Sequence, residues 1–556
     1  MSQDEPASAR PYQGGAVPGE PVAPGRPDVV ADGAADTVPV PAVPAKASNR
    51  KPPSGRRRGA QGAPRPGAQP GRAQNVALVA AAAQTRRAER IARRAVTRLV
   101  VNNEPATDPL PVVETLRGTP YSRPVEAQEP DGERARQILH FAVELGKMML
   151  RAGAGTADVE STVAAACAAC GLKRAQVDLT YQSLIVHHTT ADGHPITVMG
   201  INRGESLNFA RLRAVHALVS DLVDGHLEFE DAQARLDAIK AQRKPFSNGI
   251  VSLAWGVLAA GLIILIGGSW VSVTLGALTT IFADRMGRIL AKTGMPFFFI
   301  AFLATCASML VAMTAFQLEL ISRPQYMVAA GIVVMLPTMT LLSAVQDALT
   351  NFPLTAAGRM VQVMMIFGAL ISGVAVGLMI GAAFGMREIE VIVGGRETGV
   401  LTVLVGVLCS GVVAAAGGVA QQVSKRLLLP AALVGILGYL ALTAMSELRV
   451  GNILTTLVAS TVVGLVARPL ALRMGAPPIV LIIPGIFPLL QGLAIFAGAY
   501  ELVTGEASLA TAGANLVAAV LANAAIGVGA VFGNFLAQPL RKRRKSPGDR
   551  ARTLSS

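Results

Sequence analysis

Two apolar stretches of the chain combine prolines with polar side chains, although their composition otherwise suits a membrane helix. "VVMLPTMTLLSAVQD" covers residues 333–347, and "VLIIPGIFPLLQGLA" covers residues 480–494. A proline removes one backbone donor and frees the carbonyl one turn before it. Within lipid that carbonyl needs a partner from protein, water or a ligand. Such groups are suited to bind a small molecule that carries ammonium and carboxylate groups.

The residues that we assign to this binding chemistry lie in these two stretches and in the last apolar run. They are Pro337, Thr338, Pro484, Gly485, Pro488, Gln491, Asn515 and Asn523. Asn515 and Asn523 are about two helical turns apart, so they share a face and are expected to line one cavity. The alternative for the prolines is an ordinary kink whose free carbonyl is satisfied by a neighbouring helix.

Two carboxylates stand out because acids are scarce in the apolar part of the chain. Asp284 and Asp347 lie on the inner side of the predicted spans, and an acid at a membrane boundary can take up and release protons. We interpret both as candidates for proton coupling. The alternative for Asp347 is an interfacial carboxylate that is paired with Arg359 or Arg285.

Other reactive side chains do not form a recognisable catalytic set. His187, His188 and His194 are close in sequence, but neighbouring strand residues point to opposite faces, so these side chains should not converge on a metal. "CAAC" at 167–170 reads either as a redox pair or half a metal site, or as two small packing residues. The sequence contains no GxSxG, HExxH or phosphate-loop motif. We therefore predict no catalytic residue, no metal site and no cofactor.

The elements that must position the binding residues are membrane helices. Of the 556 residues, 51% are hydrophobic and 15% are charged, and nearly all of the apolar excess follows Asn248. We predict an α-helical integral membrane protein with about ten spans of roughly 20 residues each. These spans cover 249–267, 270–283, 296–317, 326–345, 361–385, 399–419, 428–445, 451–467, 478–499 and 512–537. The second is short enough to be tilted or partly re-entrant.

The two proline-containing stretches indicate an internal repeat. When residues 331–345 are aligned with 478–492 without a gap, Ile332 matches Ile479 and Pro337 matches Pro484. Each stretch is the fourth span of a five-span half, 249–385 or 399–537. Because five is odd, the second half enters the membrane in the opposite sense, which is the pattern of inverted repeats with broken helices at the substrate site.

The loop charges predict the orientation in the membrane. The loops on the side of the N-terminal region hold eight Lys and Arg residues and the opposite loops hold four, so the former side is cytoplasmic. Both termini are then cytoplasmic, and the plasma membrane is the expected location. The basic tail at 538–556, with "RKRRK" directly after a span, is interpreted as an orientation anchor and not as a nucleic-acid site.

The first part of the chain is predicted to be disordered. Residues 1–131 are rich in Pro, Ala and Gly and cannot bury enough apolar surface to fold. Residues 46–98 carry fourteen Lys and Arg against one acid, which is nearly the whole net charge of +14. A basic helix near 75–101 either lies on anionic lipid headgroups or is solvated. No nucleic-acid-binding domain is indicated.

An α+β domain is predicted at 132–245, on the cytoplasmic side. Its helical patterns surround two extended stretches, at 175–190 and 194–202, which read as strands around a turn at Asp192-Gly193. Glu160 stands near the start of one helix and is interpreted as a helix-dipole complement or a partner of Arg151.

Several stretches resemble the threonine/serine exporter family. "LGKMMLRAGAGTADVESTV" and "NFARLRAVHALVSDLVDGHLEFEDAQARLDAI" resemble its cytoplasmic domain. "MLPTMTLLSAVQDAL" and "IVLIIPGIFPLLQGLAIF" resemble the proline-containing helices of its two membrane halves, which are fused here in one chain. The resemblance covers about residues 132–537. In place of the Pro-Gly pair that is frequent in the family, the first of these helices has Pro337-Thr338.

The resemblance implies a secondary transporter that exports threonine and serine, driven by the proton motive force. The implied partners are these amino acids, protons and the lipid bilayer, and an oligomer is compatible with the chain. The alternative is a membrane-anchored hydrolase or regulatory protein that acts through residues 132–245.

Overall fold

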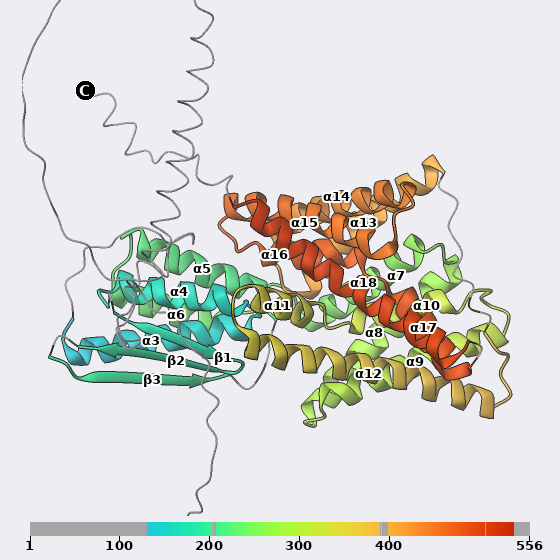
Figure 1. The fold of residues 1–556 in the computed structure, drawn as a ribbon, viewed down its shortest axis with the longest axis horizontal. Helices are drawn as coiled ribbons and strands as arrows, with labels where there is room; N and C mark the ends of the chain where they lie inside the picture. Colours follow the sequence, from blue (N-terminus) through green and yellow to red (C-terminus); the bar gives the residue numbers. More distant parts are fainter. Residues whose placement is uncertain are drawn as a thin grey trace, which may run out of the picture. The chain divides into compact units, whose positions relative to one another are not determined.

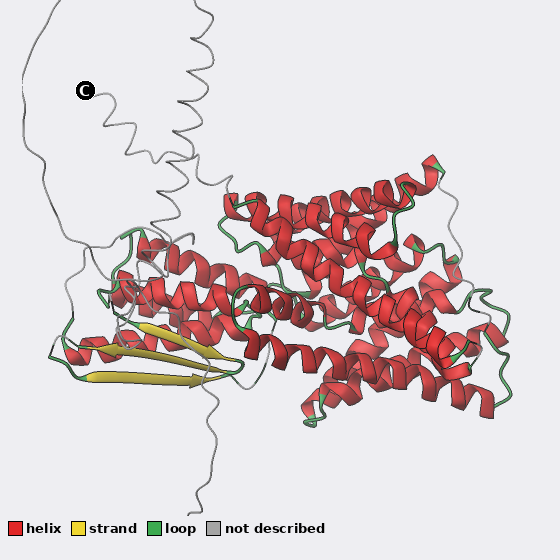
Figure 2. Ribbon diagram, viewed as in Figure 1, coloured by secondary structure: helices red, strands yellow, loops and turns green. Residues whose placement is uncertain are grey.

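The computed structural model describes residues 130–538, apart from Lys173, Ala191, Arg203, Glu205, Ser206, Glu390, 392–398 and Glu506. The predicted tails at 1–131, with the basic helix near 75–101, and at 538–556 lie almost entirely outside these residues. Figure 1 shows the described part as an α+β region followed by many helices, and Figure 2 shows that all strands belong to the α+β region.

The α+β region packs helices against a small antiparallel sheet. The sheet has the order β1-β2-β3, and α3 packs on β2 and β3. The elements are α3 (Gly132–Arg151), α4 (Thr156–Ala169), β1 (Gln176–Thr180), β2 (Ser183–Thr189), β3 (Pro195–Ile201), α5 (Phe209–Val223) and α6 (Phe229–Ala241). The turn that separates β1 from β2 at Tyr181 was not expected, because the residues on both sides of it favour extended structure.

Local sequence explains why α3 begins and what it packs against. Asp131 caps the helix by accepting a hydrogen bond from the backbone N–H of Arg134 at 2.8 Å. Apolar residues at helical spacing, such as Ile138 and Leu145, are buried against the sheet. Gly146 permits the close approach, because a Cβ atom there would lie 2.3 Å from Leu184 of β2.

The remaining helices fall into two series of matching order. The first series comprises α7 (Asn248–Leu265), α8 (Trp270–Lys292), α9 (Phe297–Gln317), α10 (Gln325–Met335), α11 (Thr338–Leu349) and α12 (Pro353–Ala383). The second comprises α13 (Val400–Ala420), α14 (Leu428–Glu447), α15 (Asn452–Arg473), α16 (Ile479–Ile486) with the short η2 (Phe487–Leu489), α17 (Gly492–Thr504) and α18 (Leu509–Leu536).

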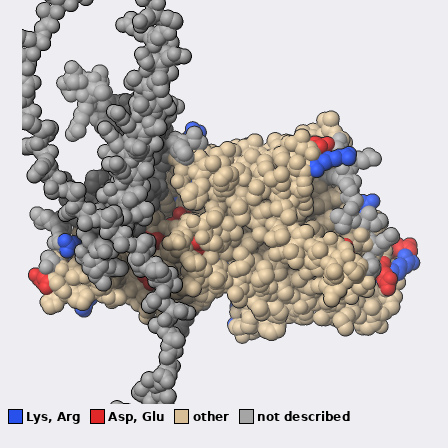
Figure 3. Space-filling model, in the orientation of Figure 1, with Lys and Arg blue, Asp and Glu red and all other residues tan. Residues whose placement is uncertain are grey.

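Within the described residues, seven helices are long and apolar enough to cross a membrane, and nine spans result if each bent pair counts as one. On the face shown in Figure 3, charged side chains gather at the edges of the helical part. The helix α8 is not among the nine. It continues to Lys292 and not to 283 as predicted, because Arg285, Met286 and Arg288 extend it with good helix-forming residues.

Each series contains one helix that is broken in the same way. The pair α10 and α11 bends by 52°, and the pair formed by α16 with η2 and α17 bends by 54°. Leu336 and Leu490 have φ/ψ of −59°/135° and −68°/135°, and the next residues, Pro337 and Gln491, have −79°/55° and −101°/66°. Both pairs also start directly after a proline in helical conformation, Pro324 or Pro478.

The expected match of Pro337 with Pro484 is therefore wrong in register. Pro484 lies inside α16, and the second break follows two turns later, at Leu490 and Gln491. A proline removes one helical hydrogen bond, but this loss does not end α16, because the surrounding residues are buried against other helices and keep helical angles. Gln491, and not Pro484, corresponds to Pro337.

The two series interlock. α10 packs on α17, α11 packs on α18, and α7 packs on α13. Glycines permit the closest contacts. Between the series, a Cβ atom at Gly492 would lie 2.3 Å from the carbonyl oxygen of Ala329, and within the second series, one at Gly533 would lie 2.0 Å from that of Thr461. Small residues of this kind are what close helix packing in a membrane requires.

Candidate functional site at the helix breaks

The first break is a tight turn. The backbone N–H of Thr338 donates to the carbonyl of Leu336 at 2.8 Å, and the Thr338 hydroxyl donates to the same oxygen at 3.3 Å. The angles of Pro337 are those of an inverse γ-turn. The chain then restarts as α11, whose first-turn N–H groups have no acceptor within their own helix.

The second break is surrounded by amide side chains. Gln491 and Asn452 of α15 exchange side-chain hydrogen bonds, of which Gln491 Nε2 to Asn452 Oδ1 measures 2.8 Å. The Gln491 backbone N–H donates to Oδ1 of the buried Asn523 at 3.3 Å, and Asn523 Nδ2 donates to the carbonyl of Ala519 at 2.9 Å. Asn452 was not anticipated, because nothing in the sequence places the start of α15 beside residue 491.

The structure does not bring all of the predicted binding residues together. Pro484, Gly485 and Pro488 are buried in helix contacts, and a Cβ atom at Gly485 would lie 2.6 Å from Val434. Asn515 is exposed and donates to Glu501 Oε2 at 2.7 Å. The expectation that Asn515 and Asn523 line one cavity is wrong, since their surroundings differ.

The two predicted proton-coupling acids are both paired. Asp284 accepts from Arg288 at 2.8 and 3.0 Å and from the Ser252 hydroxyl at 2.6 Å. Asp347 is completely buried and is paired with Arg359, which is one of the partners weighed from the sequence.

Asp347 also joins the membrane helices to the α+β region. Its Oδ1 accepts from the backbone N–H of Thr156 at 3.0 Å. Thr156 is the first residue of α4, and the first turn of a helix offers N–H groups and a partial positive charge that favour an anion. The carboxylate is thus held by Arg359 from α12 and by the start of α4.

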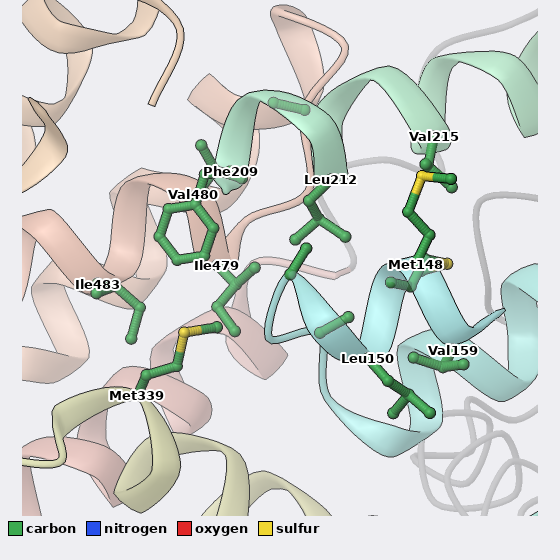
Figure 4. Packing of buried hydrophobic residues seen from close by; sticks show 14 of the residues in the cluster. Met148, Leu150, Val159, Phe209, Leu212, Val215, Met339, Ile479, Val480 and Ile483 are labelled. Carbon is green, nitrogen blue, oxygen red and sulfur yellow. The ribbon is translucent and has the colours of Figure 1, made fainter. Parts of the chain in front are cut away.

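A shared apolar core continues this junction. Phe209 and Leu212 of α5 meet Met339 of α11 and Ile479 and Val480 of α16, and all five are buried (Figure 4). Backbone bonds add to it, since the N–H groups at the start of α5, of Phe209 and Ala210, donate to the carbonyls of Gln421 and Gln422 after α13, at 3.2 and 2.9 Å.

A cavity of about 80 Å³ lies at the junction. Its polar lining includes Asp158 and His216 from the α+β region and Gln346, Arg468 and Asn534 from the helices. Gln346 Nε2 donates to Asp158 Oδ2 at 3.2 Å, and Arg468 Nη1 donates to Asn534 Oδ1 at 3.0 Å. The Asp158 carboxylate is accessible from the cavity although protein surrounds it, and burial raises its pKa, which Gln346 and Arg468 lower in part.

The histidines and cysteines of the α+β region do not converge. His187 bonds Thr197 at 2.8 Å on one face of β2, and His188 is buried on the other. Within the described residues, no group of three His, Cys, Asp or Glu could hold a metal ion. Burial raises the pKa of both thiols of "CAAC", that of Cys170 to about 12, which keeps them protonated and unreactive.

Glu160 is half-buried, and burial together with Asp178 raises its pKa. The side chain of Arg151, its expected partner, donates to Asn202 at 3.3 Å.

Apolar helices, two of them broken alike, define a helical membrane protein with an α+β region attached to its helices. Models of the threonine/serine exporter family match residues 140–381 and 406–536. A "Probable threonine/serine exporter" of Mycobacterium tuberculosis is 30% identical over 428 residues, which cover 75% of this chain and 80% of that protein. A "Threonine/serine exporter" of Corynebacterium glutamicum is 24% identical over 437 residues, 77% of this chain and 88% of that protein.

The chain belongs to the threonine/serine exporter family, with both membrane halves in one chain. No solved structure matches it.

Proposed function

We propose that this protein is a secondary active transporter that exports threonine and serine across the plasma membrane, coupled to the proton motive force. The observation that carries the proposal is the pair of helix breaks with matching backbone angles at Leu336-Pro337 and Leu490-Gln491. The names of the relatives supply the substrates.

A broken helix offers complementary groups to a zwitterion. The starts of α11 and α17 present N–H groups and partial positive charge to a carboxylate, and the carbonyls that end α10 and η2 present partial negative charge to an ammonium group. At the second break, Gln491, Asn452 and Asn523 add amide groups for the ammonium or for a hydroxyl. The backbone and amide groups bind the amino acid, and the hydroxyl of serine or threonine supplies specificity.

The proposed topology is ten spans in two inverted halves, with α8 as one of the spans. The α+β region and both chain ends lie on the cytoplasmic side, in accord with the surplus of Lys and Arg in the loops of that side. In this arrangement each broken helix packs against the other half, since α10 packs on α17. Alternating access then follows when one half rocks against the other.

Asp347 is the preferred proton carrier. It is buried and paired with Arg359, and it touches the α+β region through Thr156. Asp284 is the second candidate, but it is held by a neighbour on its own helix, Arg288. The hydrogen bond between Thr156 and Asp347 also bears on the role of the α+β region. A movement of α4 would expose the Asp347 carboxylate, so this contact favours a regulatory role for the region over a hydrolytic one.

The test is efflux of threonine from cells loaded with a threonine-containing dipeptide. We expect the native protein to speed efflux over an empty vector, and a protonophore to abolish the gain. Asp347→Asn should lose the coupled efflux at an equal amount of folded protein, and Asp284→Asn should retain it. If cells with the native protein release threonine no faster than cells with the empty vector, the substrate assignment is rejected. Efflux that persists with the protonophore rejects the coupling.

A further inference from the structure

We propose that the junction cavity is a second amino-acid site, where a small zwitterion binds between Asp158 and Arg468 on the cytoplasmic side of the helix breaks. The proposal rests on the proposed function and adds to it a loading site that is built jointly by the α+β region and both membrane halves. The ligand class is an α-amino acid with a small side chain.

The walls of the cavity come from two parts of the chain. α4 contributes Asp158, Ser161 and Thr162, while α11 contributes Gln346 and α15 and α18 contribute Arg468 and Asn534. The cavity therefore lies between the α+β region and helices of both series. A ligand there bridges these parts and favours the docked arrangement.

The charges have opposite signs on the two walls. Asp158 offers a carboxylate to an ammonium group, and the Arg468 guanidinium offers N–H donors to a carboxylate. The two groups are close enough for Arg468 to lower the pKa of Asp158 in part. Gln346 donates to Asp158 at 3.2 Å, and Arg468 donates to Asn534 at 3.0 Å, and these hydrogen bonds restrict both charged side chains.

The size and the apolar lining fit a small amino acid. A volume of about 80 Å³ has room for roughly five to eight water molecules at 10–15 Å³ each, which is about the number of non-hydrogen atoms in serine or threonine. Leu342, Ile482 and Val531 line the rest of the cavity and suit a methyl group. The hydroxyl of Thr162 donates to the Asp158 carbonyl at 2.6 Å, and its oxygen can still accept a hydrogen bond from a ligand hydroxyl.

The test is protection from a thiol reagent in the purified full-length protein. Ser161→Cys places a reactive group in the cavity wall, and the native protein, whose cysteines stay in place, gives the background. We expect threonine and serine to slow labelling at position 161, and tryptophan to have no effect because it exceeds the cavity. Labelling that threonine leaves unchanged overturns the proposal.

Charge variants provide the second arm. Asp158→Asn and Arg468→Gln should each weaken threonine protection by about tenfold or more, as expected for the loss of a hydrogen bond to a charged group. Glu160→Gln on α4 and Arg473→Gln on α15 are the matched controls, since neither residue lines the cavity, and both should retain protection. Equal protection in the charge variants and in their controls also overturns the proposal.

The outcomes separate this site from the proposed function. Threonine export by the native protein without protection at position 161 removes the cavity site and leaves the exporter in place. Protection by threonine without export in the cell assay supports the cavity site and removes the export function.

Discussion

At the scale of residues, charged side chains such as Asp347 join the α+β region to the membrane helices. Asp347 has no exposed surface, and its two partners come from α12 and from the α+β region. A buried ion pair contributes little net stability, but removing one partner leaves an uncompensated charge. Asp158 also lies between these two parts, with Gln346 and Arg468 around it, but its carboxylate is accessible from the cavity.

The Asp347 pair predicts a compensated pair of variants. Arg359→Met leaves Asp347 buried with only the Thr156 N–H, and should lower the free energy of unfolding by about 3 kcal/mol. The double variant Asp347→Asn/Arg359→Met should recover part of this loss, because no charge stays buried. Thermal unfolding in detergent measures both. If the loss in free energy of unfolding in the double variant equals the sum of the losses in the two single variants, the two residues are not paired.

Asp158 predicts a pH dependence of binding at the cavity. Burial raises the pKa of this carboxyl, and ammonium binding needs the ionised form. Protection at position 161 should therefore be full above the raised pKa and weaken as pH falls through it, at pH values where an ordinary Asp is still charged. Asp347, Gln346, Arg468 and His216 surround Asp158. Asp158→Asn should flatten the profile, and an unchanged profile in this variant would assign the pH effect to another group.

At the scale of elements, the two broken helices determine where the proposed binding groups lie. Gly492 is the first residue of α17, and it lies directly against the backbone carbonyl of Ala329 in α10. The contact holds the two broken helices, one from each series, side by side, so the second break depends on the first helix pair for its position.

Gly492 therefore predicts a steric effect on transport. Gly492→Ala places a Cβ atom 2.3 Å from the Ala329 oxygen, so α10 and α17 must move apart, and threonine efflux should fall by about tenfold. Gly368→Ala on α12 is the control, because nothing lies within 4 Å of a Cβ atom there. Efflux is compared at equal amounts of folded protein. If both variants export alike, the packing at the break does not matter to function.

These elements were predictable from the sequence where a local residue pattern determines them. They were less predictable where contacts between distant helices determine them. Hydrophobic runs located the helices, and the place of Pro337 located the first break. The second break was misplaced at Pro484, because burial around α16 keeps that proline helical, and Gln491 breaks the helix instead. Asn452 was missed because it reaches the site only through the packing of α15.

At the scale of the whole described chain, the α+β region and the membrane helices share a core and a cavity. Phe209 and Ile479 belong to one buried cluster, and Asp347 is closed off from water by Thr156. Residues so distant in sequence form a site only after folding, so neither the cavity nor the Thr156 contact was predictable. In the proposed coupling, Asp347 would exchange protons with water only after α4 moves away from α11.

This closure predicts that locking α4 on α11 stops transport. A Cβ atom at Gly155 would lie 2.9 Å from the Gln346 side chain, so Gly155→Cys with Gln346→Cys brings two thiols together. Oxidation should abolish threonine efflux, and a reductant should restore it, while each single variant should be insensitive to oxidant. Undiminished efflux from the fully cross-linked protein would contradict a movement at this junction.

Export of threonine through the helix breaks can be measured as threonine efflux from proteoliposomes that contain only the purified protein, with and without an imposed proton gradient. We expect the native protein to release threonine and serine and the proton gradient to accelerate release. Gln491→Ala should reduce release by about tenfold or more, because it removes the side-chain hydrogen bonds to Asn452. Release that equals protein-free liposomes, or that is unchanged in Gln491→Ala, would contradict binding at the helix breaks.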